Sequence, residues 1–201
     1  MNRRTLIAVP LLVLAATLPA QAEIISLDTI SRYLNGLDSA VSAFVQTNAD
    51  GSAAQGTVYI KRPGRARFEY EAPNAALVLA SAGSVAIFDQ KSNEAPEQYP
   101  LRRTPLNLIL AREVDLGRAK MVIGHREEGD TTRVLAQDPK NPEYGTIELV
   151  FAADPVALTA WVITDDLGNR TVVELQGLQQ GVRIPEGLFN ISAEIQRRAG
   201  D

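Results

Sequence analysis

The stretch that decides the fold is GTVYIKRPGRARFEY, residues 56–70. Pro63 and Gly64 form a turn signal between two short runs in which apolar and polar residues alternate. Side chains alternate between the two faces of a strand. One face therefore carries Val58, Ile60 and Arg62 from the first run and Ala66, Phe68 and Tyr70 from the second. The pattern predicts an antiparallel hairpin with one apolar and one polar face.

Other segments of the chain repeat this strand pattern, with turn residues between them. Strands are predicted over residues 41–47, 56–62, 65–71, 76–80, 84–89, 120–126, 131–137, 146–151, 158–164 and 170–175. The short spacings favour hairpins, so we expect one mainly β, antiparallel domain over residues 23–201.

Two short helices interrupt the strands. The first follows Ser26 or Asp28 as a possible N-cap, and its apolar side chains are Ile30, Tyr33, Leu34 and Leu37. Thr104-Pro105 predicts a second, very apolar helix that ends near Arg112 and contains Leu106, Leu108, Ile109 and Leu110. A large antiparallel sheet with so few helices to cover it curls into a barrel or leaves an apolar concavity. A lipid would fit such a concavity.

The first 22 residues have the pattern of a cleavable secretory signal. Arg3 and Arg4 precede an apolar run, and Ala20-Gln21-Ala22 precedes Glu23. We therefore expect export to the periplasm, with the general secretory and twin-arginine routes both open. The chain has no cysteine, which excludes disulfides and a lipobox, so we expect a soluble protein. We also expect it to be a monomer.

Charge and residue types argue against several function classes. Removing Arg3 and Arg4 with the leader changes the formal charge from −4 to −6, which argues against nucleic acid or an anionic membrane as the main partner. The single histidine, His125, has no cysteine or carboxylate at metal-ligand spacing, and no serine lies in a nucleophile elbow. We predict no catalytic residues, no metal site and no cofactor.

Arg62 differs from the neighbouring basic residues Arg65 and Arg67, because alternation places it on the apolar face of the hairpin. A buried arginine without acceptors costs several kcal/mol. Arg62 is therefore expected to bind a carboxylate or the carbonyls of whatever covers that face.

Residues 56–70 resemble the signature of the outer-membrane lipoprotein carrier family, LolA, whose members have a strand ending Lys-Arg-Pro and then an aromatic-rich strand. The resemblance extends over nearly the whole mature chain. It includes Phe44-Val45-Gln46, Leu79 to Gly83, Thr104 to Arg112, and Leu188 to Ile191.

The resemblance implies an incomplete antiparallel β-barrel, or half-barrel, covered by a helical lid. It implies a periplasmic chaperone that takes lipoproteins from an inner-membrane lipoprotein-releasing ABC transporter to an outer-membrane receptor. Arg62 would be the lid latch, and Val58, Ile60, Phe68 and Tyr70 would line the lipid-binding cavity. The lid helices would contribute Ile30, Leu34, Leu37, Leu106, Ile109 and Leu110.

The chain also departs from the family pattern. Ala66 stands where an aromatic residue is common and Phe68 where some relatives have tryptophan, which indicates a roomier pocket wall. The chain ends soon after Ile191, so docking details are not carried over to its tail. Two alternatives stay open: a carrier or sensor of another envelope lipid, and a lipid-responsive regulatory module on the same fold.

Overall fold

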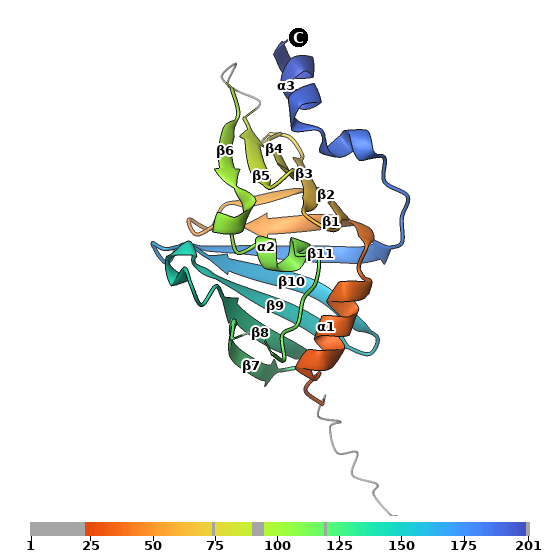
Figure 1. The fold of residues 1–201 in the computed structure, drawn as a ribbon, viewed down its shortest axis with the longest axis vertical. Helices are drawn as coiled ribbons and strands as arrows, with labels where there is room; N and C mark the ends of the chain where they lie inside the picture. The colour runs from red at the N-terminus through yellow and green to blue at the C-terminus, as the bar shows by residue number, and fades with distance from the viewer. Residues whose placement is uncertain (1–22, 74, 90–94, 119, 200–201) are drawn as a thin grey trace, which may run out of the picture.

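The strands of the described chain pair into one antiparallel sheet that does not close (Figure 1). The computed structural model describes residues 23–73, 75–89, 95–118 and 120–199, so the predicted signal, residues 1–22, lies outside the described residues. The strand order is β6-β5-β4-β3-β2-β1-β11-β10-β9-β8-β7, which leaves β6 and β7 as the two edges. The predicted mainly β, incomplete barrel is confirmed.

The bounds of the elements follow the sequence pattern closely. The strands are β1 (Ser39–Thr47), β2 (Ala53–Lys61), β3 (Arg65–Tyr70), β4 (Leu77–Ser81), β5 (Ser84–Phe88), β6 (Glu97–Pro100), β7 (Val122–Glu128), β8 (Thr131–Gln137), β9 (Thr146–Ala153), β10 (Val156–Thr164) and β11 (Arg170–Gln180). The helices are α1 (Leu27–Gly36), α2 (Asn107–Leu110) and α3 (Ile191–Ala199), with 3₁₀ turns η1 (Leu101–Arg103), η2 (Pro142–Tyr144) and η3 (Glu186–Phe189). Within the described residues, every helix is too short or too polar to span a bilayer.

The β2–β3 hairpin has the predicted register. Val58 pairs with Phe68 and Ile60 pairs with Ala66, and all four side chains are buried on the inner, concave face. Gly56 pairs with Tyr70, and a Cβ at Gly56 would lie 2.0 Å from the backbone oxygen of Glu69. Only glycine fits this close approach, which keeps β2 and β3 in contact at their open end.

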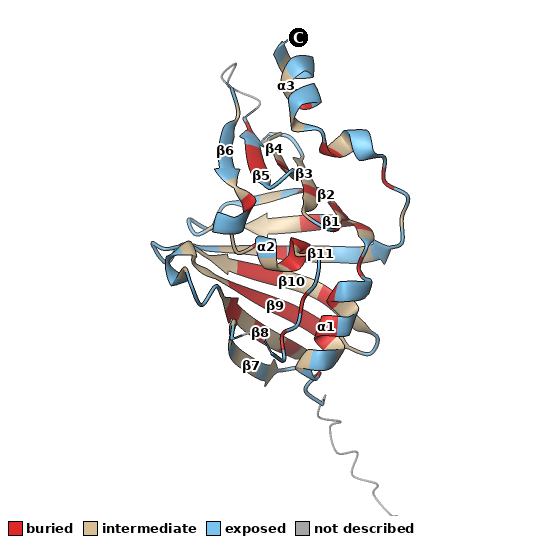
Figure 2. Cartoon of the chain, in the orientation of Figure 1, coloured by how far each residue is buried: buried red, intermediate tan, exposed pale blue. Residues whose placement is uncertain are grey.

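The inner face is covered by α1 and by residues 101–118 and 120, which we call the lid segment. Figure 2 shows the buried residues of β8, β9 and β10 behind it. The core between them includes Phe44, Leu149, Phe151 and Trp161 together with apolar residues of α1 and α2. Ser26 is the N-cap of α1, since its hydroxyl accepts a hydrogen bond from the Thr29 amide.

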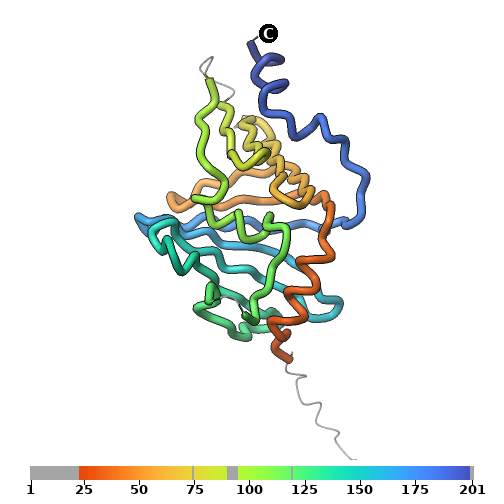
Figure 3. Tube along the Cα trace, viewed as in Figure 1, coloured from red at the N-terminus to blue at the C-terminus, as the bar shows by residue number. Residues whose placement is uncertain are grey.

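The outer face of β3, β4 and β5 is not solvent-exposed, which corrects the expectation of one polar face. The C-terminal segment, residues 182–199, returns along this side and ends in α3 (Figure 3). It buries Ile184 and Phe189 against Leu79 and Phe88 in a second apolar core. The physical reason is that β4 and β5 are apolar at consecutive positions, so both of their faces need cover.

Three elements differ from the sequence prediction. β6 is a short polar edge strand ending at Pro100, and α3 lies beyond the last element expected. α2 begins at Asn107 rather than at Thr104-Pro105, because the Thr104 hydroxyl donates to the Leu101 carbonyl and leaves the first turn uncapped. These differences leave the inner face and its cover unchanged.

Candidate functional site: the lid and the apolar face beneath it

The lid segment and α1 are joined along their length by polar contacts. The Asn35 side chain donates to the Val114 carbonyl at 2.8 Å and accepts from the Val114 amide at 2.9 Å. One turn earlier, the buried Ser31 hydroxyl accepts from the Leu116 amide at 3.0 Å and donates to the Leu27 carbonyl. Because Ser31 and Asn35 lie four residues apart on one face of α1, the helix and the segment form one cover, which we call the lid.

The turn of the β2–β3 hairpin holds one end of the lid. Arg62, which is 8% exposed, donates from Nε to the Ala111 carbonyl at 3.1 Å, and its Nη2 donates to the same oxygen. The Gly64 amide donates to the Leu110 carbonyl at 2.8 Å. Gly64 has a φ of +72°, a conformation that favours glycine and directs its amide toward α2. Two carbonyls left free at the end of α2 are thus bound by one turn.

Burial lowers the pKa of the Arg62 guanidinium, and the charge of Asp38 opposes that shift. Arginine still remains charged at neutral pH. The cation therefore depends on the Ala111 carbonyl for its hydrogen bonds, and moving the lid away would leave it to water or to another acceptor.

The structure brings the other sequence-predicted residues together in the main core. Val58, Ile60 and Phe68 are buried on the sheet side, and Tyr70 packs half-buried beside them. The lid side of the same core consists of Ile30, Leu34, Leu37, Leu106, Ile109 and Leu110. The two sets pack against one another, so the described structure has its lid closed.

Aromatic rings fill the centre of the closed face. Phe44 stands edge-on to Phe68 and to Tyr70, with centroids 5.7 and 5.1 Å apart, and Phe68 stands edge-on to Trp161 at 6.2 Å. The Tyr70 hydroxyl donates to Gln46 at 2.7 Å. Burial raises the pKa of Tyr70 to about 12, so this hydroxyl keeps its proton at neutral pH.

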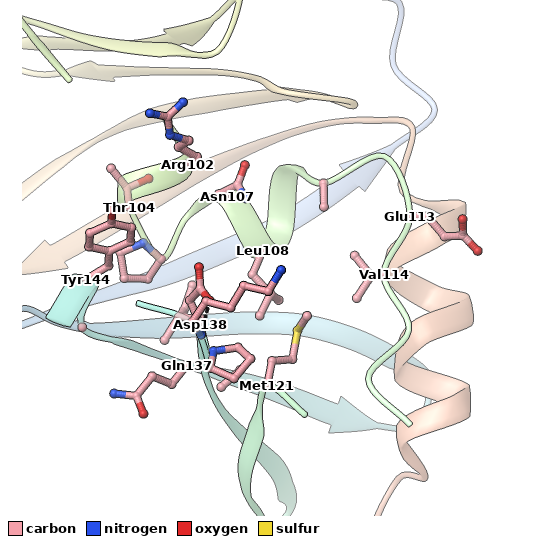
Figure 4. Close-up of a pocket in the computed structure, with 17 residues that line it drawn as sticks. Arg102, Thr104, Asn107, Leu108, Glu113, Val114, Met121, Gln137, Asp138 and Tyr144 are labelled. Atoms are coloured by element: carbon pink, nitrogen blue, oxygen red, sulfur yellow. Dashed lines mark hydrogen bonds between the residues drawn. The ribbon is translucent and has the colours of Figure 1, made fainter. Parts of the chain in front are cut away.

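An open pocket of about 340 Å³ lies beside this core, between α2 and the loop that joins β8 to β9 (Figure 4). Its apolar wall is Leu108, Val114, Met121, Ala136 and Ile147. Arg102, Asp138 and Lys140 are among its polar residues. The pocket leads under the lid, and none of the four predicted cavity residues lines it.

Comparisons with known proteins identify the family of this chain. A family model described as "Outer membrane lipoprotein carrier protein LolA" matches residues 35–192. The chain belongs to the LolA family.

Relatives within the LolA family match along most of the chain. The outer-membrane lipoprotein carrier protein of Chromohalobacter salexigens is 24% identical, over 93% of this chain and 94% of that protein. That of Azotobacter vinelandii is 26% identical, over 84% of this chain and 89% of that protein. A LolA superfamily protein of known structure from Nitrosomonas europaea is 10% identical with a TM-score of 0.43, and the match covers 83% of this chain and 98% of that one.

Sequence reasoning predicted that Arg62 needs an acceptor, and Arg62 does donate to the Ala111 carbonyl, but it missed the open pocket and the Asn35 and Ser31 contacts. The pocket depends on where the irregular segment 111–121 runs, and that path has no periodic signal. The polar contacts had a partial signal, because Ser31 and Asn35 interrupt α1 at a four-residue spacing.

Proposed function

We propose that this protein is an exported periplasmic carrier that shields lipoprotein acyl chains on its inner face and shuttles lipoproteins from the inner to the outer membrane. The observation that supports it most is an apolar inner face closed by a lid whose edge is held by polar contacts of Arg62 and Gly64. Apolar packing alone would favour permanent closure, whereas backbone hydrogen bonds can be exchanged for water when the lid moves.

Loading requires the lid to open. The 340 Å³ pocket is at the lower end of the range for small-molecule sites, about 300–1,000 Å³, and a lipoprotein brings several acyl chains. Each buried CH₂ contributes ~0.8 kcal/mol, which is enough to displace the lid from the sheet. Val58, Ile60, Phe68 and Tyr70 then line the enlarged lipid-binding cavity, and the pocket is where the first chain enters.

Release of the cargo is the reverse of loading, because the lid closes as the acyl chains leave. The closed lid buries the inner face again and restores the hydrogen bonds of Arg62. Because the closed lid competes with cargo for the inner face, the net affinity for cargo is lowered by the free energy of opening the lid. The carrier therefore binds lipoprotein tightly enough to remove it from one membrane and weakly enough to transfer it to an acceptor.

The partners follow from this role. They are lipoproteins, an inner-membrane lipoprotein-releasing ABC transporter as donor and an outer-membrane lipoprotein receptor as acceptor. The protein acts as a monomer, without cofactor, nucleic acid or catalysis.

A second candidate is a carrier or sensor of another envelope lipid. The observation that favours it is the size of the open pocket, which suits one lipid chain without any movement of the lid. The two candidates differ in whether a whole lipoprotein accompanies the lipid.

Extraction of a purified lipoprotein from vesicles tests the proposal. Leu108→Glu places a charge on the half-buried pocket wall and should reduce extraction at least about tenfold, because a carboxylate in an acyl-chain path is strongly unfavourable. Leu167→Glu is the matched control, since Leu167 is 82% exposed in the β10–β11 turn. Equal extraction by the two variants would refute the entry pocket, and no extraction by the unaltered protein would refute the carrier function.

A further inference from the structure

The lid segment differs in charge from the rest of the protein. Residues 101–120 contain five basic and two acidic side chains, a formal charge of +3 in a mature chain of −6. The remainder of the mature chain therefore has a formal charge of −9. The protein is an acidic molecule whose cover is basic.

The cations of the lid segment are exposed and mostly unpaired. Among the residues that the structure describes, no carboxylate forms an ion pair with Arg102, Arg103, Arg112 or Lys120. Arg118 alone has a partner, Asp115 at 3.7 Å. By contrast, Arg67, Arg126 and Arg133 on the sheet are each paired with a glutamate. Arg32, Lys140, Arg170 and Arg183 also have no ion-pair partner among the described residues, but they are scattered, whereas the lid segment has four such cations within residues 102–120. The lid segment thus leaves a concentration of charge available to a partner.

Two strands that precede the lid segment, β5 and β6, carry exposed apolar side chains. Tyr99 is 46% exposed and Ile87 is 38% exposed. Tyr99 pairs with Val85, whose side chain belongs to the main core, so Tyr99 and Ile87 point to the inner side of the sheet. β6 leads directly into η1 (Figure 1), so Tyr99 precedes Arg102 by three residues in the chain. One acidic group, Glu97, accepts from the Tyr99 hydroxyl.

We propose that the lid side of this protein docks on the surface of anionic phospholipid bilayers. The docking face comprises Arg102, Arg103, Arg112 and Lys120 with Tyr99 and Ile87. Tyrosine beside arginine and lysine is the combination that membrane–water interfaces select, because the ring enters the headgroup layer while the cations meet lipid phosphates. An acidic protein would also satisfy the cations, but the open pocket with its apolar wall has Arg102 in its lining, and a bilayer accounts for the cations and the apolar pocket together.

The geometry gives docking a direct consequence. The face contains the mouth of the open pocket, to which Arg102 contributes, so a docked molecule presents the pocket to the bilayer. The formal charge of the whole chain hides this property, because most of the acidic side chains lie outside the lid segment. The proposal concerns the empty protein and does not depend on the identity of its cargo.

Sedimentation with lipid vesicles tests it, using the protein of residues 23–201 without lipoprotein. Vesicles of phosphatidylcholine are compared with vesicles containing about 30 mol % phosphatidylglycerol, in ~50 mM and ~500 mM NaCl, over which screening increases steeply. We expect binding to the anionic vesicles at low salt and its loss at high salt. Binding that ignores phosphatidylglycerol or salt would overturn the proposal.

Charge reversal locates the face. Each cation near an anionic surface strengthens binding roughly fivefold, so Arg103→Glu with Arg112→Glu should weaken binding at least about 25-fold. Arg170→Glu with Arg183→Glu makes the same change of charge at exposed positions outside the lid, and should stay within about twofold of the unaltered protein. Equal losses in the two double variants would overturn the location.

The absence of cysteine allows a site-specific probe. Tyr99→Cys labelled with nitrobenzoxadiazole should shift its emission to the blue on anionic vesicles, whereas Leu167→Cys with the same label should not. If the protein sediments while the label at residue 99 stays unshifted, the lid side does not face the bilayer and the proposal is wrong. The basic face would then fit an acidic protein instead.

Discussion

At the scale of single residues, Arg62 connects the apolar face of the sheet to the lid segment. Strand alternation placed a cation on an apolar face, and that placement required an acceptor before any fold was known. The acceptor is the carbonyl of Ala111, in a segment 49 residues further along the chain. The sequence could predict the need for a partner but not which carbonyl supplies it, since that depends on the path of the lid segment.

Replacement of Arg62 by leucine should separate loading from release. The introduced apolar side chain would keep the inner face intact, so extraction of lipoprotein should stay within about twofold of the unaltered protein. The closed state loses hydrogen bonds from a charged group, each worth about 1.5–3 kcal/mol, so release to an acceptor should slow about tenfold or more. Timed transfer from carrier to acceptor vesicles measures this.

Arg65→Leu is the matched control for that measurement. Arg65 begins β3 directly after the same turn, but its guanidinium pairs with Glu186 on the outer side, away from the lid. Its replacement should leave release unchanged. Normal release by the Arg62→Leu variant would mean that Arg62 does not hold the lid.

At the scale of elements, the β2–β3 hairpin connects both covers of the sheet. Arg62 and Gly64 bind the lid on the inner side. On the outer side, Lys61 and Arg65 pair with Glu186, and Arg67 donates to the Leu188 carbonyl. Lys61, Arg65 and Arg67 therefore anchor the C-terminal segment, which the sequence did not predict because their acceptors lie more than 100 residues away.

The helix α3 is fixed to the sheet through Glu194, which is 8% exposed. Arg197 and Arg198 bind its carboxylate at 2.6 and 2.9 Å, and Arg67 of β3 lies 3.7 Å away. Burial would raise the pKa of Glu194, but these arginines lower it to about 2. The charged form thus stabilises the folded state, and that contribution is lost as the pH falls from about 4.5 toward 2.

Glu194→Gln should therefore destabilise the protein in a pH-dependent way. We expect a loss of about 1–2 kcal/mol in the free energy of unfolding at pH 7, shrinking by about half or more at pH 3. Urea unfolding at the two pH values measures it, with Glu143→Gln on the exposed turn η2 as the control that changes neither. A loss that is equal at pH 7 and pH 3 would contradict the ionic role of Glu194.

Sequence patterns predicted the elements whose periodicity is strong and missed those without it. The ten expected strands are all present, because each alternates or is continuously apolar. β6 has no apolar alternation, and only its pairing with β5 defines it. α3 had a signal that was not used, since Asn190 caps it and Ile191 and Ile195 lie four residues apart.

At the scale of the whole molecule, the open sheet and its lid follow from the distribution of apolar residues. One long antiparallel sheet with an apolar concave side leaves a surface that short helices must cover. The covering elements are held partly by polar contacts, at Arg62, Ser31 and Asn35. A lid of this kind suits a protein that must open, and membership of the LolA family indicates what enters.

The net charge of the chain was less informative than the distribution of its charged residues. The net charge of −6 argued against an anionic membrane, yet the lid segment alone has a formal charge of +3. Which charges pair with one another depends on the fold, so composition could not show that five of the six cations in the described strands form ion pairs, whereas four of the five in the lid segment do not. The proposed docking on anionic bilayers rests on this difference.

The most direct test of the carrier function is mass spectrometry of the protein isolated from the periplasm under native conditions, with its ligands identified after denaturation. The account predicts complexes with acylated lipoproteins, and their loss in the Leu108→Glu variant but not in Leu167→Glu. Recovery of the protein with a different envelope lipid and no lipoprotein would contradict it.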